Sequence, residues 1–319
     1  MGAGFLIVGL GELLWDLLPE GKKLGGAPAN FAYHARALGD DGLPVSRVGT
    51  DALGGEIQAR LAELGLPGEQ VQVDPLRPTG TVHVALDPRG LPTYTITPEV
   101  AWDYLAWDEA LAALAAKADA VCFGSLAQRG PTSRATIRAF LARTRPGALR
   151  VFDVNLRQSW YTPEVLRDSL QRASIVKLND SELPVVLEAL GLPSGETPHS
   201  GQGAPRSGRE TPHSGRGGMA DGCRALRQAF GLRLVCLTLG PEGSLLVTEQ
   251  GVVASPGVKV EVADTVGAGD AFTAGICHHW LRGTPLARTA EAANHYGAWV
   301  ATQVGPTPPV PADVLAGVR

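Results

Sequence analysis

The chain has 319 residues, of which 44% are hydrophobic, and its formal net charge is −4. This length suits one large α/β domain or two smaller ones, and the apolar content is enough for a sizeable core. The weak negative charge, without a block of Lys or Arg, argues against a protein that binds nucleic acid through a broad positive field.

The first predicted element is a β-strand at 5–8, an apolar run that ends in glycine. The segment around it has no basic region and soon reaches Glu12 and Asp16, which is typical of a strand rather than of a signal peptide. The longest uncharged run, 292–312, contains polar residues and four prolines, so we expect no membrane span. The four cysteines show no CxxC spacing, which favours buried free thiols in a reducing cytoplasm.

Apolar runs and helical patterns alternate along much of the chain. Further runs typical of buried strands lie at 120–123, 149–154, 174–178 and 234–239. Helical patterns lie between them at 108–117, 133–143, 164–173 and 180–190. This order predicts βαβ units and therefore an α/β fold with a mostly parallel sheet that helices cover on both faces.

Two regions interrupt the alternation. The β-rich stretches at 81–87 and 93–97 are separated by Pro88-Arg89-Gly90, which predicts an antiparallel ribbon that is either a lid or an ordinary edge hairpin. Residues 194–218 contain seven glycines and three prolines and carry the hexapeptide ETPHSG twice. This composition predicts a flexible, low-complexity insert that is exposed to solvent.

The strongest chemical signal is DTVGAGD at 264–270, followed by a helical pattern at 271–281. Small residues at 267–269 allow backbone N–H groups to converge at a helix start, which makes an anion site with the helix dipole behind it. Asp270 beside such an anion is suited to accept a proton from a hydroxyl that attacks a phosphate. The simpler alternative is an aspartate that only caps the helix.

Other phosphate-binding motifs do not fit the sequence. The pattern GxxxxGK[ST] is absent, and the early GLG at 9–11 does not continue as GxGxxG. A P-loop NTPase and a Rossmann dehydrogenase are therefore disfavoured.

A second signal is GGAPAN at 25–30, which opens a helical pattern at 31–38. Gly25 and Gly26 permit a close approach of the backbone to a ligand, and Asn30 offers both a donor and an acceptor for a polyol. Asp16, beyond the first strand, is either a hydroxyl acceptor or a solvated carboxylate in a turn.

Together, LGGAPANFAYHARALG and DTVGAGDAFTAG resemble the paired signatures of the ribokinase-like (PfkB) carbohydrate kinases. The resemblance covers essentially the whole chain except 194–218, and GELLWDLLP, FDVNLRQ and KLNDSEL are most similar to bacterial fructokinases. It implies a single domain over 1–319, a three-layer sandwich whose small β lid comes from about 12–24 and 78–104. The lid hairpins leave exposed edges that can pair between subunits, which suggests a homodimer.

The resemblance also implies an activity: transfer of the γ-phosphoryl group of ATP, with Mg²⁺, to a primary hydroxyl. D-fructose is the first choice of acceptor, and fructose 6-phosphate is then the product. The same fold acting on ribose, 2-keto-3-deoxygluconate or a nucleoside is the alternative. A non-catalytic sugar or nucleotide sensor is a third reading.

Site residues follow from the resemblance position by position. Asp270 matches the catalytic base, and the anion hole matches Gly267, Ala268 and Gly269. The sugar-binding positions match Asp16, Gly26 and Asn30, beside Gly25. Tyr94 and Trp102 either pack over the sugar or only close the core of the lid.

On the nucleotide side, Asn179 and Glu182 match the NxxE element that helps to place Mg²⁺ and the phosphates. Without the family, Asn179 would pass for a helix cap. The positions along the nucleotide match Thr238, Gly240, Gly243 and Asn294. Arg157 either holds a phosphoryl group or pairs with Asp153. A K⁺ site would match Asp264, Val266, Val300, Gln303 and Gly305, although Pro309 stands where the family often has a hydroxyl residue.

Overall fold

The computed structural model describes residues 4–18, 21–86, 92–194 and 212–319. Within them, nine strands form one sheet in the order β13-β12-β11-β10-β9-β8-β1-β4-β5. Its strands are β1 (Leu6–Leu10), β4 (Asp41–Gly49), β5 (Val71–Asp74), β8 (Ala120–Phe123), β9 (Leu149–Asp153), β10 (Ile175–Asn179), β11 (Leu234–Thr238), β12 (Ser244–Thr248) and β13 (Gly251–Ser255).

All strand pairs from β5 to β11 are parallel, whereas β12 and β13 add to the β11 edge as antiparallel strands. The prediction of a mostly parallel sheet is confirmed, and the five strands predicted from the sequence are all present in it. Parallel order brings the carboxyl ends of the strands to one edge, where ligands bind in open α/β sheets.

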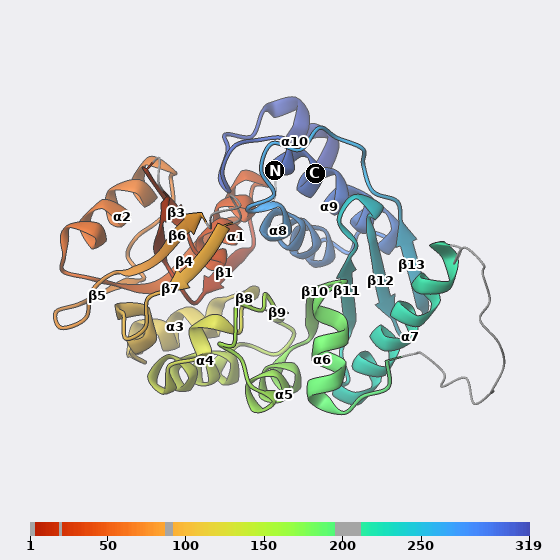
Figure 1. Cartoon of the computed structure of the whole chain (residues 1–319), viewed down its shortest axis with the longest axis horizontal. Helices are drawn as coiled ribbons and strands as arrows, with labels where there is room; N and C mark the ends of the chain where they lie inside the picture. Colours follow the sequence, from red (N-terminus) through yellow and green to blue (C-terminus); the bar gives the residue numbers. More distant parts are fainter. Residues whose placement is uncertain (1–3, 19–20, 87–91, 195–211) are drawn as a thin grey trace.

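Helices cover both faces of this sheet (Figure 1). One face carries α3 (Glu109–Lys117), α4 (Pro131–Arg143), α5 (Pro163–Arg172), α6 (Glu182–Leu190) and α7 (Pro212–Phe230). The other carries α1 (Ala27–Ala37), α8 (Ala268–Leu281), α9 (Leu286–Ala301) and α10 (Ala312–Val318). Side chains of β8 alternate between the two cores: Val121 and Phe123 face the first, Ala120 and Cys122 the second.

A smaller sheet lies at one end of the molecule, drawn in red and orange in Figure 1. Its order is β3-β2-β6-β7, from β2 (Leu14–Leu18), β3 (Gly21–Gly25), β6 (Gly80–Leu86) and β7 (Pro92–Ile96). β6 and β7 form the expected antiparallel ribbon, although the turn residues 88–90 lie outside the described residues. Trp15 and Leu24 pack with α2 (Ala52–Glu63) in a core that is separate from the two cores of the large sheet.

Three single turns of 3₁₀ helix complete the described elements. They are η1 (Ala101–Tyr104), η2 (Leu126–Gln128) and η3 (Gly240–Glu242).

The segment predicted as an insert, 194–218, reaches into a helix at its carboxyl end. Residues 195–211 lie outside the described residues, but 212–218 form the first two turns of α7. Pro212 is tolerated there because the first turn of a helix needs no N–H from it. Downstream, Ala220, Cys223 and Leu226 recur at helical spacing and pack into the first core, which sustains the helix despite its glycines.

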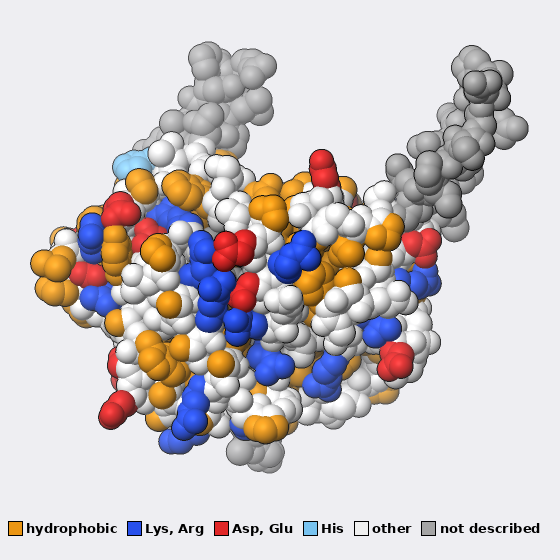
Figure 2. Space-filling model, turned by 90° about the horizontal axis from the view of Figure 1, so that it is seen from below, with side chains coloured by type: hydrophobic (Ala, Val, Ile, Leu, Met, Phe, Trp, Pro, Cys, Tyr) orange, Lys and Arg blue, Asp and Glu red, His pale blue; other side chains and the backbone are white. Residues whose placement is uncertain are grey.

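All four cysteines are free and buried, as predicted. Among the described helices, none combines the length and the apolar character that crossing a membrane requires. On the face shown in Figure 2, basic side chains stand beside acidic and uncharged ones.

Candidate active site

Two cavities of about 780 Å³ each meet at the amino end of α8. The small-sheet cavity lies between the small sheet and the strand ends; predicted site residues in its lining are Asp16, Gly25, Gly26, Asn30, Tyr94, Arg157, Asp264, Val266, Gly267, Gly269 and Asp270. The β11 cavity lies beyond α8; predicted residues in its lining are Asn179, Thr238, Gly240, Gly243, Ala268, Gly269 and Asn294. Lys177, Thr265 and Gly269 line both cavities.

Five predicted residues line neither cavity: Trp102, Glu182, Val300, Gln303 and Gly305. Trp102 is only 1% exposed and lies in the core. The guanidinium of Arg129 stacks over it, with Cζ of Arg129 4.0 Å from the centre of the Trp102 ring. Of the two alternatives for Trp102, the structure therefore places it in a core and not over a ligand. Val300 is likewise buried among the core side chains of α8 and α9.

Asp270 lies in the first turn of α8 and lines the small-sheet cavity, next to Gly269, which lines both cavities. Its Oδ2 accepts a hydrogen bond from Nδ2 of Asn30, 2.9 Å away, which ties α8 to α1. Burial, and after it the Asp153 carboxylate, raise the pKa of Asp270 to about 7 against the lowering effects of Asn30, Lys177 and Arg157. The cap position of α8 is held by Gly267 and has no side-chain cap, so Asp270 is not a capping residue.

Gly267 gives the anion hole its shape. Its φ of 84° lies in the left-handed region, and a Cβ there would come within 2.6 Å of Cα of Pro306. Pro306 is in turn fixed by His34, whose Nε2 lies 2.9 Å from the Pro306 carbonyl oxygen. The sequence predicted glycine here so that backbone N–H groups could converge; the contact that requires glycine in the structure is one with the chain itself.

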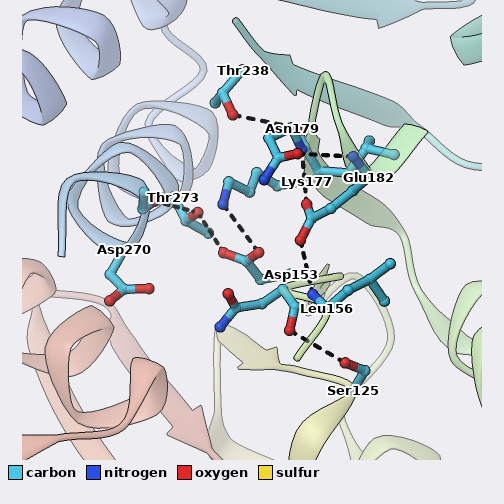
Figure 3. A network of polar contacts seen from close by, with 12 residues as sticks. Ser125, Asp153, Leu156, Lys177, Asn179, Glu182, Thr238, Asp270 and Thr273 are labelled. Atoms are coloured by element: carbon cyan, nitrogen blue, oxygen red, sulfur yellow. Dashed lines mark hydrogen bonds and ion pairs between the residues drawn. The ribbon is translucent and has the colours of Figure 1, made fainter. Parts of the chain in front are cut away.

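A buried ion pair behind Asp270 was missed from the sequence. Nζ of Lys177 lies 3.1 Å from Oδ1 of Asp153, and Thr273 donates its hydroxyl to Oδ2 of the same carboxylate at 3.2 Å (Figure 3). Burial lowers the pKa of Lys177, but the Asp153, Glu182 and Asp270 carboxylates raise it above its usual value. A lysine inside an apolar strand needs a partner, and that was the available signal.

Arg157 lies on the loop that follows β9 and does not pair with Asp153, so that alternative was wrong. The loop residues Asn155 and Gln158 have φ of 41° and 50°. This left-handed backbone conformation is unfavourable for residues other than glycine. Arg157 lines the small-sheet cavity and lowers the pKa of Asp270.

Two further carboxyl groups face the small-sheet cavity. Burial raises the pKa of Asp16 to about 6, against the lowering effects of Arg157 and Lys23. Burial also raises the pKa of Glu12, whose Oε2 has no hydrogen-bond partner among the described residues. Glu12 was not predicted as a site residue; its place directly beyond the first strand was the signal.

The β11 cavity is less charged and partly apolar. Val258, Val260, Val262 and Phe272 contribute to its wall. Nδ2 of Asn294 donates to the carbonyl oxygens of Ser255 and Pro256, at 3.4 and 3.3 Å. Such a wall suits a flat, largely apolar group with a few polar atoms.

Asn179 caps the turn that leads into α6. Its Oδ1 accepts hydrogen bonds from the backbone N–H groups of Ser181 and Glu182, at 3.0 and 2.9 Å. The capping reading of Asn179 therefore holds in the structure, alongside its place in the β11 cavity.

Two of the predicted cation-binding residues, Val266 and Gly305, lie at the Asp264 carboxylate. Its oxygens accept the backbone N–H groups of Val266 and Gly305, at 3.0 and 3.1 Å, and Nζ of Lys23 lies 3.6 Å away. Within the described residues, no group of three or more His, Cys, Asp or Glu side chains could hold a metal ion.

This geometry suits transfer of a phosphoryl group between two ligands. A carboxylate with a pKa near neutrality can accept a proton from a ligand in the small-sheet cavity. The first-turn amides of α8 and the Lys177 ammonium can hold an anion that enters from the β11 cavity.

Comparisons with known proteins agree with this geometry. The family model described as pfkB family carbohydrate kinase matches residues 20–313. A fructokinase of Klebsiella pneumoniae is 31% identical over 278 residues, which is 84% of this chain and 81% of the relative.

Solved structures share the fold over nearly the whole chain. An uncharacterized sugar kinase from Pyrococcus horikoshii has a TM-score of 0.75 at 26% identity, covering 95% of this chain and 93% of its own. The aminoimidazole riboside kinase from Salmonella enterica has a TM-score of 0.74 at 23% identity, and the match covers 100% of both chains. With the family model matching most of its length, this chain belongs to the pfkB family of carbohydrate kinases.

Proposed function

We propose that this protein is an ATP-dependent fructokinase, which converts D-fructose to fructose 6-phosphate. The observation that carries the proposal is Asp270, a half-buried carboxyl group whose pKa is raised to about 7. It lines the small-sheet cavity directly beside Gly269, which lines both cavities. It stands at the start of α8, where one ligand's hydroxyl and another ligand's terminal phosphate can meet.

The sugar would occupy the small-sheet cavity. Asp16 and Asn30 offer polar atoms to its hydroxyl groups, and the small sheet would close over it as a lid that excludes water and so limits hydrolysis of ATP. Asp270 would accept the proton of the primary hydroxyl as the oxygen attacks the γ-phosphorus. The bond from that phosphorus to the bridging oxygen breaks, and ADP leaves.

The nucleotide would occupy the β11 cavity, with its base against the apolar wall and its phosphates toward α8. The amides of Gly267, Ala268 and Gly269 would hold the γ-phosphoryl group, and Arg157 would approach it from the other cavity. The Lys177 ammonium lies against α8, since a Cβ on Gly269 would come within 3.0 Å of its Nζ.

Mg²⁺ would enter with the substrate, bound to the phosphates of ATP, because such ions are commonly held through phosphates and few protein ligands. A K⁺ ion beside Asp264 stays a prediction, and it would have to share that carboxylate with Lys23. The four free thiols are consistent with a cytoplasmic enzyme. The small sheet ends in the edge strands β3 and β7, through which two copies could pair as a homodimer.

Fructose is chosen because of the fructokinase relatives and because one structure of the same fold, from Vibrio cholerae, is described with fructose and ADP bound. A riboside or nucleoside acceptor is the second candidate, since kinases for such acceptors share the fold.

A panel of acceptors, assayed for ADP production, tests the choice. We expect the highest kcat/KM with D-fructose. A higher value with ribose, 2-keto-3-deoxygluconate or a nucleoside would replace fructose, whereas sugar binding by calorimetry without any turnover would indicate a sensor.

A further inference from the structure

Glu182 is buried, with 6% of its surface exposed, yet it faces neither cavity. Its Oε2 accepts the backbone N–H of Asn179 at 2.9 Å, while Oδ1 of Asn179 accepts the N–H of Glu182 at 2.9 Å. This reciprocal pair is the pattern of a capping box, here in the turn that leads into α6. One carboxylate oxygen is thus engaged within its own segment.

The other oxygen reaches a different part of the chain. Oε1 of Glu182 accepts the backbone N–H of Leu156 at 2.8 Å, across 26 residues (Figure 3). Hydrogen bonds from N–H groups to a buried carboxylate are among the stronger ones in proteins. The carboxylate therefore ties the loop 155–158 to the turn 179–182, which borders the β11 cavity.

The loop 155–158 needs such a tie. Its residues all line the small-sheet cavity, and two of them, Asn155 and Gln158, have a left-handed backbone. Strained conformations of this kind persist only where surrounding contacts fix them. On its other side, Nε2 of Gln158 donates to the Tyr94 carbonyl oxygen in β7, at 2.5 Å.

We propose that Glu182 is a positioning residue, which holds Arg157 in the small-sheet cavity and links that loop to the turn at the β11 cavity. The proposal rests on the proposed function for what Arg157 does, but not for the tie itself. It differs from the role that the family resemblance implies, in which Glu182 helps to place Mg²⁺. Both carboxylate oxygens already accept N–H groups, and neither is directed into a cavity that would hold the nucleotide.

Hydrogen exchange of the ligand-free protein tests the tie without any reaction. In Glu182→Gln, the amide of Leu156 loses a charged acceptor, and we expect peptides covering 154–158 to exchange at least tenfold faster. Glu188→Gln is the matched control: it makes the same change on an exposed glutamate of the same helix, and exchange should not alter. Unchanged exchange in a folded Glu182→Gln protein, with its melting temperature measured alongside, would overturn the tie.

Kinetics then separate positioning from metal binding. We expect Glu182→Gln to lower kcat/KM for the acceptor at least tenfold at every Mg²⁺ concentration. In an Arg157→Ala background the same substitution should cost less than threefold, because the group it positions is gone. Recovery of Glu182→Gln by excess Mg²⁺, or equal losses in both backgrounds, would contradict the proposal. If the wild type turned over no acceptor, the proposed function would fail while the exchange result still decided the tie.

Discussion

The two cavities that meet at α8 differ in chemical character. Seven Asp, Glu, Lys or Arg side chains line the small-sheet cavity, against three in the β11 cavity. The first contains carboxyl groups with raised pKa values, whereas the second combines apolar side chains with a helix start. Under the proposed function, proton transfer would take place in the small-sheet cavity, and the β11 cavity would recognise a nucleotide through shape and dipoles.

In the proposed function Asp270 is the base, so its loss should have the largest effect. We expect Asp270→Asn to lower kcat by about 10³-fold or more, since amide nitrogen and oxygen cannot take the proton. Binding of ATP in the other cavity, measured by calorimetry, should change less than threefold. Near-normal turnover would remove Asp270 from the role of base, and loss of ATP binding would show that the cavities do not act separately.

Lys177 lines both cavities, and its removal should destabilise the wall between them. In Lys177→Met, Asp153 keeps a buried charge without its partner, and we expect the free energy of unfolding to fall by about 3 kcal/mol. Chemical denaturation measures this, with Lys259→Met, at the β11 cavity alone, as the control. An unchanged midpoint would mean that the ion pair adds nothing to the stability.

The pH dependence of kcat/KM should reflect only the groups of the small-sheet cavity. With a pKa near 7, Asp270 is mostly protonated below about pH 6, so kcat/KM should fall about tenfold per pH unit there. Because Arg157 lowers this pKa, Arg157→Ala should move the acid limb to higher pH. A flat profile between pH 5 and 8 would contradict the assignment of the base.

The titration of Asp270 should also affect the stability of the fold, which should fall as pH rises whereas activity rises. The folded pKa of Asp270 lies above its unfolded value of 3.8, so between about pH 4 and 7 the unfolded chain binds fewer protons and this residue's contribution to stability falls as pH rises. At pH 8 the variant Asp270→Asn should therefore melt a few degrees higher than the wild type, and at pH 4 it should not. A lower melting temperature at both pH values would contradict this account.

The smallest expected effect is on the acceptor KM, and it distinguishes Tyr94 from Trp102. Tyr94 is 55% exposed and lines the small-sheet cavity, whereas Trp102 is buried outside it. We expect Tyr94→Ala to raise the acceptor KM about fivefold. Trp102→Phe should leave KM within twofold, and a larger change would show that the core residue shapes the site.

Much of this arrangement follows from local sequence signals. The apolar strands, the ribbon at β6 and β7 and the glycine-rich start of α8 each carry a period or a turn that identifies them. The strand-end rule placed Asp16 at the site, and the family resemblance added Asn30 and Asp270; all three line the small-sheet cavity.

What escaped prediction depends on contacts between distant segments. Lys177 meets Asp153 across neighbouring strands, and Glu182 meets Leu156 between two loops. No spacing in the chain fixes such pairs, because they require the register of the whole sheet. Val300 and Trp102 show the converse: a matching position does not reveal whether a side chain faces a cavity or a core.

The central claim is that a hydroxyl in one cavity receives the phosphoryl group held at the other. Phosphorus NMR of the wild type with ATP and D-fructose tests it most directly. We predict equal amounts of ADP and one new phosphomonoester, fructose 6-phosphate. Free phosphate without a sugar phosphate, or fructose 1-phosphate as the product, would contradict the account.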